Sequence, residues 1–149
     1  MKKGHSSSDP VIEEKVVQLG WSDKPRGIDV DACSGVIYFT NWNAREPSVM
    51  RVWPSGFGLE AVVTTDIRMP NAVAVDSAER AFYWGDARMD KIERVDAVTL
   101  ERRVLARAAP QHPFDLALHG GFLFYRDVAQ EMDRNWAAAK ICKDRGAIQ

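Results

Sequence analysis

The chain has 149 residues, of which 46% are hydrophobic, and its 20 basic and 21 acidic residues leave a formal net charge of −1. A chain with balanced charge lacks the excess of Lys and Arg that binding to a nucleic-acid backbone requires, so nucleic acid is not an expected partner. Two cysteines are too few for a small module held together by several disulfides.

The first fourteen residues are polar. They include Lys2, Lys3 and a run of serines, and they hold no apolar stretch of the length that a signal peptide or a membrane span needs. We therefore expect residues 1–14 to form a flexible head, and we expect no membrane segment in this chain. The next segment, Lys15–Leu19, has the composition of a strand, and its position ahead of the first repeat predicts the outer strand of a preceding unit.

The first full unit begins at Pro25. Ile28 and Val30 stand two positions apart, which places both on one face of a short strand. A turn at Ser34-Gly35 then leads into the aromatic tetrad Tyr38–Asn41. Two more strands are predicted at 48–52 and 59–63. The unit therefore consists of four strands in hairpin order, and the face opposite Ile28 is expected to meet the next unit.

The same order occurs twice more. The second unit has Pro70 and the tetrad Tyr83–Asp86, and the third has Pro113 and the tetrad Phe124–Asp127. The two remaining strands of the second unit are predicted at 91–95 and 100–105. Successive tetrads start 45 and then 41 positions apart. A period of about 40 to 45 residues with four strands in each unit is typical of the blades of a β-propeller.

These repeats predict an all-β fold over residues 15–127. It contains two complete propeller blades, part of a third, and the outer strand of a preceding blade. The pattern stops after residue 127, because 128–145 is rich in alanine and charge and has large or apolar residues at helical spacing, namely Val128, Met132, Trp136 and Ala139. We interpret 128–149 as a tail foreign to the propeller, either helical or disordered.

The repeats resemble the YWTD propellers of the LDL receptor and its larger relatives. The stretch from Gly20-Trp21-Ser22-Asp23-Lys24-Pro25-Arg26-Gly27 through Gln111-His112-Pro113-Phe114-Asp115 is especially similar to a propeller of the giant endocytic LDL-receptor-related proteins. The resemblance implies a ring of six blades, and 149 residues allow about three and a half. The remaining blades and the EGF-like modules of such a receptor are therefore implied partners that this chain lacks.

The resemblance also implies a function. Receptors of this family lie on the extracellular side of the plasma membrane and in endosomes, bind protein ligands, and release them at low pH. We expect this chain to be a ligand-binding propeller segment of an endocytic LDL-receptor-related protein that acts by recognition and not by catalysis. Two alternatives stay open: a truncated gene product that retains the repeats without function, and a fragment of a six-bladed propeller hydrolase.

The tetrads are expected to be structural. Aromatic residues at their packing positions bury area between blades, although the third tetrad departs from the family pattern more than the other two. The structural set comprises Tyr38, Phe39, Thr40, Asn41, Tyr83, Trp84, Gly85, Asp86, Phe124, Tyr125, Arg126 and Asp127. The carboxylates of Asp31 and Asp76, at strand ends before turns, are expected to accept backbone donors and not to bind metal.

Ligand contacts are expected at the rim formed by the loops around Arg26, Asn71 and Phe114, since propellers bind through their rim loops. In relatives that bind short peptide motifs, an Asn after this Pro contacts the ligand, and Asn71 matches that residue. The candidate ligand-facing residues are Arg26, Trp42, Asn71, Arg88 and His112. For Trp42 and Trp53, packing between blades and ligand contact are both open interpretations.

Few other residues suggest a metal site or a catalytic group. His112 and His119 lie seven residues apart across a strand, which is not a zinc-ligand spacing, and no Cys cluster accompanies them, so no metal or cofactor is expected. His112 has two interpretations, one structural and one as a group that titrates in acidified endosomes and aids ligand release. No nucleophile elbow, phosphate-binding Gly loop or metal-ligand helix occurs in the sequence.

Overall fold

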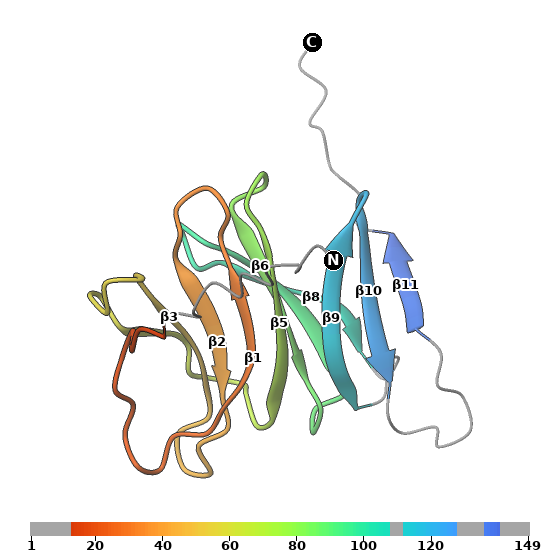
Figure 1. Cartoon of the computed structure of the whole chain (residues 1–149). Coiled ribbons are helices and arrows are strands. Elements are labelled where there is room, and N and C mark those ends of the chain that lie inside the picture. The colour runs from red at the N-terminus through yellow and green to blue at the C-terminus, as the bar shows by residue number, and fades with distance from the viewer. Residues whose placement is uncertain (1–12, 108–111, 128–135, 141–149) are drawn as a thin grey trace, which may run out of the picture.

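A computed structural model of the chain describes residues 13–107, 112–127 and 136–140. Within these ranges it contains eleven strands in three antiparallel sheets that follow chain order (Figure 1). The first blade comprises β1 (Pro25–Val30), β2 (Ile37–Asn41), β3 (Ser48–Val52) and β4 (Glu60–Val63). The second comprises β5 (Pro70–Asp76), β6 (Ala81–Asp86), β7 (Lys91–Asp96) and β8 (Arg102–Arg107). The third comprises β9 (Pro113–His119), β10 (Phe122–Asp127) and β11 (Trp136–Lys140).

The strands predicted within the blades form, although the last strand of the second blade spans 102–107 and not 100–105, and the all-β fold is confirmed. Each blade pairs its strands in sequence order, as in β1-β2-β3-β4, so every connection within a blade is a hairpin. Gly35 supplies the positive φ of 78° that its turn requires, whereas Arg80 takes the left-handed conformation at 50° although this is uncommon for a residue other than glycine. In the first two blades the ladder shifts register just after the leading proline, which donates no hydrogen bond.

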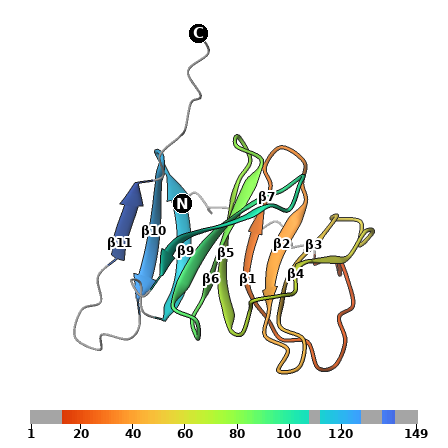
Figure 2. The ribbon, with the colours of Figure 1, turned by 180° about the vertical axis from the view of Figure 1, so that it is seen from behind.

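The sheets stack face to face like successive sectors of a wheel, and the view from behind shows the same succession (Figure 2). Between the first and second blades lies a core that includes Tyr38, Val73, Phe82 and Trp84. The rings of Tyr38 and Phe82 are 4.9 Å apart between centroids. A second core joins the second and third blades and is formed by Ala72, Ala74, Tyr83, Ile92, Leu116 and Leu123. Neighbouring residues of one tetrad therefore serve opposite interfaces, as a period of two requires.

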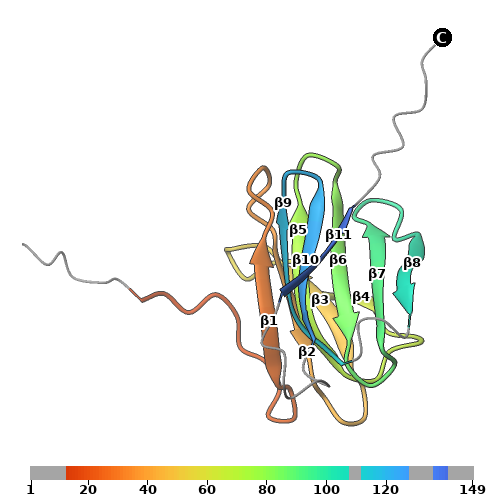
Figure 3. The same cartoon turned by 90° about the vertical axis from the view of Figure 1, so that its right-hand side faces the viewer.

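The inner strands β1, β5 and β9 pack in succession, which Figure 3 shows from the side of β11. Gly27 lies where two inner strands approach most closely: a Cβ at this residue would be 2.8 Å from the carbonyl oxygen of Asn71 and 2.9 Å from the Cα of Ala72. The Asp29 carboxylate accepts the N–H of Val75 at 2.7 Å across the same junction. Both contacts fix the position of the second blade relative to the first.

The tail prediction is wrong over Trp136–Lys140. These residues form strand β11, which pairs antiparallel with β10 so that Arg126 faces Trp136 and Phe122 faces Lys140. The free edge of β10 offers a row of backbone donors and acceptors, and pairing with them outweighs the modest helix preference of alanine. Residues 128–135 and 141–149, including Cys142, lie outside the described residues, and whether the tail is foreign to the propeller stays a prediction.

The outer strand predicted at Lys15–Leu19 does not form, since residues 13–20 carry no strand. Val16, Val17 and Leu19 instead line an apolar cavity of about 260 Å³ with Phe39 and Val52 on the outward face of the first blade. Ile28 on that face remains 68% exposed, whereas its counterpart Val73 is 5% exposed against the first blade. The part of the head at residues 1–12 lies outside the described ranges.

Candidate functional site at the inner-strand rim

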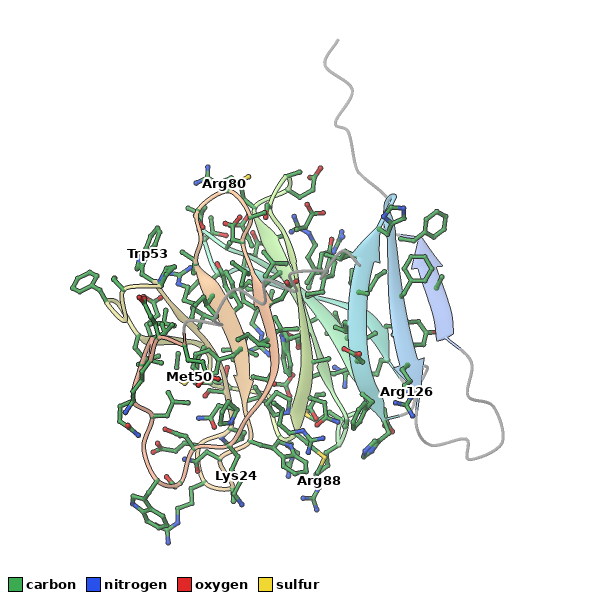
Figure 4. The ribbon with its side chains drawn as sticks, in the orientation of Figure 1. Lys24, Met50, Trp53, Arg80, Arg88 and Arg126 are labelled. Carbon is green, nitrogen blue, oxygen red and sulfur yellow. The ribbon has the colours of Figure 1, made fainter. Side chains whose placement is uncertain are left out.

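The three inner strands begin with a proline at the same end of the stack. Loops 42–47 and 87–90 reach this end too, because each connects a second strand to a third. We call this end the inner-strand rim. Lys24, Arg88 and Arg126 mark it along the lower edge of Figure 4, and Trp53 and Arg80 mark the opposite end. The rim is therefore where the predicted ligand-facing residues meet.

A row of alternating cations and aromatic rings crosses the rim. The guanidinium carbon of Arg26 lies 4.5 Å from the ring centroid of Trp42 and 5.5 Å from that of Phe114. The guanidinium carbon of Arg126 lies 5.4 Å from the same Phe114 ring. Trp42 and Arg26 come from the first blade and Phe114 and Arg126 from the third. We call these four residues the cation–π row, and its packing holds two arginines in fixed positions.

Asn71 lies at the start of the inner strand of the blade between them. It is 5% exposed, and its side-chain N–H donates to the carbonyl of Pro113 at 3.4 Å. Its Oδ1 is buried and accepts no hydrogen bond from any residue that the structure describes. A buried amide oxygen without a partner is costly, and such atoms are often completed by a water or a ligand. Asn71 therefore has one acceptor atom that no described residue satisfies.

Arg88 and His112 also lie at the rim, but no contact joins them to the cation–π row within the described part of the chain. The backbone N–H of Arg88 donates to Asp86 Oδ1 at 3.0 Å, and its side chain is exposed. The backbone N–H of His112 donates to Asp90 Oδ1 at 2.7 Å, and His112 takes a φ of 52°. Both residues are anchored through the main chain.

Asp86, the last residue of the second tetrad, organises the rim loops around it. Its fully buried carboxylate accepts the backbone N–H groups of Arg68, Met69, Arg88 and Met89 at 2.7 to 3.1 Å. Two of these donors belong to the loop between the first and second blades and two to the loop after β6. The expectation that this residue is structural agrees with these bonds.

Blade one has an amide, Asn41, where blade two has this carboxylate. Asn41 Oδ1 accepts the N–H of Lys24 at 2.9 Å, and its Nδ2 donates to Asp23 Oδ1 at 2.7 Å. The hydrogen bond from Asn41 is the main reason that the pKa of Asp23 is lowered, and a bond from Asn43 adds to it. Asp23 thus supplies the negative charge that the tetrad lacks.

The other predictions have mixed outcomes. Asp31 accepts the N–H of Cys33 and the hydroxyl of Ser34, and Asp76 accepts the N–H of Glu79, so both carboxylates cap turns as expected. Trp42 packs under Arg26 at the rim, whereas Trp53 is 44% exposed at the other end, and neither belongs to the cores between blades.

Sequence reasoning missed two members of the cation–π row. Phe114 was expected only to mark a rim loop, and Arg126 was expected to be structural. The signal for Arg126 was present, since it departs from the usual residue of the tetrad. The Asp127 side chain lies outside the described residues.

Several exposed basic residues lie at the inner-strand rim. Within the described ranges, the exposed basic residues of the rim form no ion pair. They are Lys24, Arg26, Arg45, Arg68, Arg88, Arg107 and Arg126, and the exposed acidic residues Glu46 and Asp66 lie in the same rim loops as Arg45 and Arg68. Groups of three or more His, Cys, Asp or Glu side chains placed to hold a metal ion do not occur among the described residues. The chemistry on offer is that of fixed cations, aromatic faces and one amide acceptor.

Comparison with known proteins shows which family the repeats belong to. Low-density lipoprotein receptor-related protein 5 of Homo sapiens is 35% identical over 117 residues, which is 78% of this chain and 7% of the relative. The Mus musculus protein of the same name gives the same values. The chain carries YWTD propeller repeats of the LDL-receptor-related family. Protein cueball of Drosophila grimshawi is 29% identical over 111 residues, or 72% of this chain and 18% of that protein. The chain thus spans less than a fifth of each of these relatives, and no family model matches it.

Solved structures agree on the fold. A chain in the crystal structure of a nidogen/laminin complex superposes with a TM-score of 0.68 at 24% identity, over 74% of this chain and 42% of that one. A gluconolactonase from Xanthomonas campestris gives a TM-score of 0.58 at 22% identity, over 69% and 40%. At these identities the likeness concerns the propeller fold alone. Within the described residues of the YWTD repeats, no helix is long and apolar enough to cross a membrane.

Proposed function

We propose that these YWTD repeats form a non-catalytic, extracellular recognition segment of an endocytic LDL-receptor-related protein, and that the inner-strand rim is its ligand-binding surface. One observation carries the proposal: Asn71 Oδ1, which is buried and has no partner among the described residues, lies near the start of β5, in the blade between the two that build the cation–π row. Cations held against aromatic rings, at the same end of the stack as this acceptor, suit a surface that binds a peptide.

The chemistry of the rim suggests how a polypeptide ligand would bind. A backbone or amide N–H of the ligand satisfies Asn71 Oδ1, and a carboxylate of the ligand meets Arg26 or Arg126. The rings of Trp42 and Phe114 already hold these guanidinium groups, so little side-chain freedom is lost on binding. Loops at the rim of a rigid scaffold commonly serve binding in this way.

Peptides selected on the wild-type chain from a displayed library test this proposal. Asn71→Ala should weaken the selected peptides by about tenfold, the size expected when a buried hydrogen bond is lost. Arg103→Ala, on the exposed outer strand β8, is the matched control and should leave binding unchanged. The rim is not the binding surface if both variants bind alike. A variant Asn71→Ala that loses cooperative melting as well as binding would show that the residue is structural.

The proposal extends to ligand release in acidified endosomes, through His112. A protonated His112 would add a positive charge to a rim that already carries several exposed basic residues. The added charge tightens the hold on an acidic part of a ligand and loosens the hold on a basic part, so release on acidification requires a basic or neutral ligand segment over His112. The ratio of affinities at about pH 7 and about pH 5.5, compared between wild type and His112→Ala, tests this step. An identical ratio in both proteins would exclude His112.

A further inference from the structure

A second concave surface lies at the end of the stack opposite the inner-strand rim. It is a groove of about 880 Å³ between the first and second blades. Its lining comes from the loop 53–59 between β3 and β4, from the turns 31–36 and 77–80, and from Ala97 and Val98 after β7. We call it the β3–β4 groove. Tyr38, Arg51, Trp53, Phe57, Arg80 and Val98 are among the residues that line it.

Both walls of the groove expose apolar side chains. Trp53 is 44% exposed and Phe57 78% exposed on one wall, and Val98 is 62% exposed on the other. The loop that carries the two aromatic residues is two residues longer than the corresponding turn of the second blade. Large rings displayed on a loop beside a groove are typical of surfaces that contact another protein.

The aromatic loop is rigid before any partner arrives. The N–H of Trp53 donates to the carbonyl of Phe57 at 3.0 Å, and the N–H of Gly56 donates to the carbonyl of Trp53 at 2.8 Å. Gly58 has a φ of 69°, and a Cβ at this residue would lie 3.2 Å from Cδ1 of the Trp53 ring. The ring therefore lies directly over the loop backbone. A wall that is fixed beforehand loses little conformational entropy on binding.

The charges around the groove leave one cation without a partner. Arg51 is occupied, because it donates to Glu60 Oε1 at 2.8 Å and to the carbonyl of Ala97 at 2.8 Å. The carboxylate of Asp31 is occupied by the N–H of Cys33 and the Ser34 hydroxyl. Arg80 is exposed and forms no ion pair with any described residue. The groove thus combines apolar walls with a single available positive charge at its edge.

We propose that the β3–β4 groove docks an extended polypeptide segment of a partner protein, with a bulky apolar side chain between Trp53 and Val98 and a neighbouring carboxylate on Arg80. The apolar walls favour the bulky apolar side chain, and the Arg80 guanidinium, which has no ion pair among the described residues, favours the carboxylate. None of these residues belongs to the inner-strand rim. The site is therefore independent of the proposed function, and one chain can hold a ligand at the rim and a partner at the opposite end.

The test uses a blocked pentapeptide, acetyl-Gly-Phe-Gly-Glu-Gly-amide, titrated into the ¹⁵N-labelled chain up to about 5 mM, the affinity range of so small a contact. Amide shifts should gather on residues 53–59 and 97–101. Replacing Glu with Lys in the peptide, or making the Arg80→Gln variant, should weaken binding about fivefold, as loss of one charge-assisted contact implies. Trp53→Ala should abolish the shifts and Trp53→Phe should restore part of them.

The control is Trp21→Ala, since Trp21 is 99% exposed and lies outside the groove. It should bind like the wild type. Absence of shifts at the highest concentration, shifts confined to the inner-strand rim, or equal binding of the Glu and Lys peptides would each overturn the proposal. Shifts that depend on the concentration of the chain without peptide would mean that a second copy occupies the groove, and would also overturn it.

Discussion

Replacing Asp86 with alanine tests how the rim is held in place. The carboxylate is 0% exposed and accepts four backbone N–H groups from two loops. Hydrogen bonds to a charged group contribute about 1.5 to 3 kcal/mol each, but water entering the vacated space satisfies some of the donors. We therefore expect Asp86→Ala to lower the free energy of unfolding by about 4 kcal/mol, near the upper end for single substitutions.

Urea unfolding followed by circular dichroism measures this loss, with Asp76→Ala as the matched control. Asp76 also ends a strand of the second blade, but among the described residues its carboxylate accepts only the N–H of Glu79, so its loss should cost about 1 kcal/mol. Asp86→Asn should be costly too, because an amide N–H would face backbone donors without the compensating carboxylate that Asp23 gives Asn41. Equal losses for Asp86→Ala and Asp76→Ala would refute the reasoning.

Two further predictions concern the junction between the first two blades. Burial raises the pKa of Glu93, but hydrogen bonds from Arg102 and Lys91 outweigh it, so the folded pKa lies below its ordinary value of 4.5. The stability that ionised Glu93 contributes is present above about pH 4.5 and is lost as pH falls through the lowered pKa. The free energy of unfolding should therefore decline more steeply on acidification in the wild type than in Glu93→Gln. Parallel curves for the two proteins would contradict this. Gly27→Val should lower the free energy of unfolding measured in urea by about 3 kcal/mol, because the new side chain would clash with the backbone of β5. A loss no larger than that of Gly20→Ala would disprove the close approach.

Much of the fold could be predicted because its signals are local and repeated. Ile28 and Val30, or Val73 and Val75, show a period of two, and the tetrads recur at the spacing of a blade, so the strands and their order followed from the residues alone. The direction of stacking could also be inferred, since alternate positions must face opposite neighbours. The burial of Val73 against the first blade agrees with it.

The other features of the fold and the site could not be predicted, because they depend on contacts between residues far apart in the sequence. Strand β11 forms because the edge of β10 is available, and the sequence around Trp136 favours a helix when considered alone. The cation–π row joins residues 26 and 114, which become neighbours only when three blades stack. The partnership of Asp23 with Asn41 is likewise invisible until the leading loop folds over the tetrad.

The inner-strand rim exists only if the repeats stack radially as propeller blades. Nuclear Overhauser effects between the aromatic protons of Tyr38 and Phe82 test this stacking most directly, since their ring centroids are 4.9 Å apart in different blades. We predict strong cross-peaks between these rings, and between the Tyr83 ring and the Leu123 methyl groups of the third blade. Fully assigned spectra in which cross-peaks occur within each sheet and are absent between sheets would contradict the account.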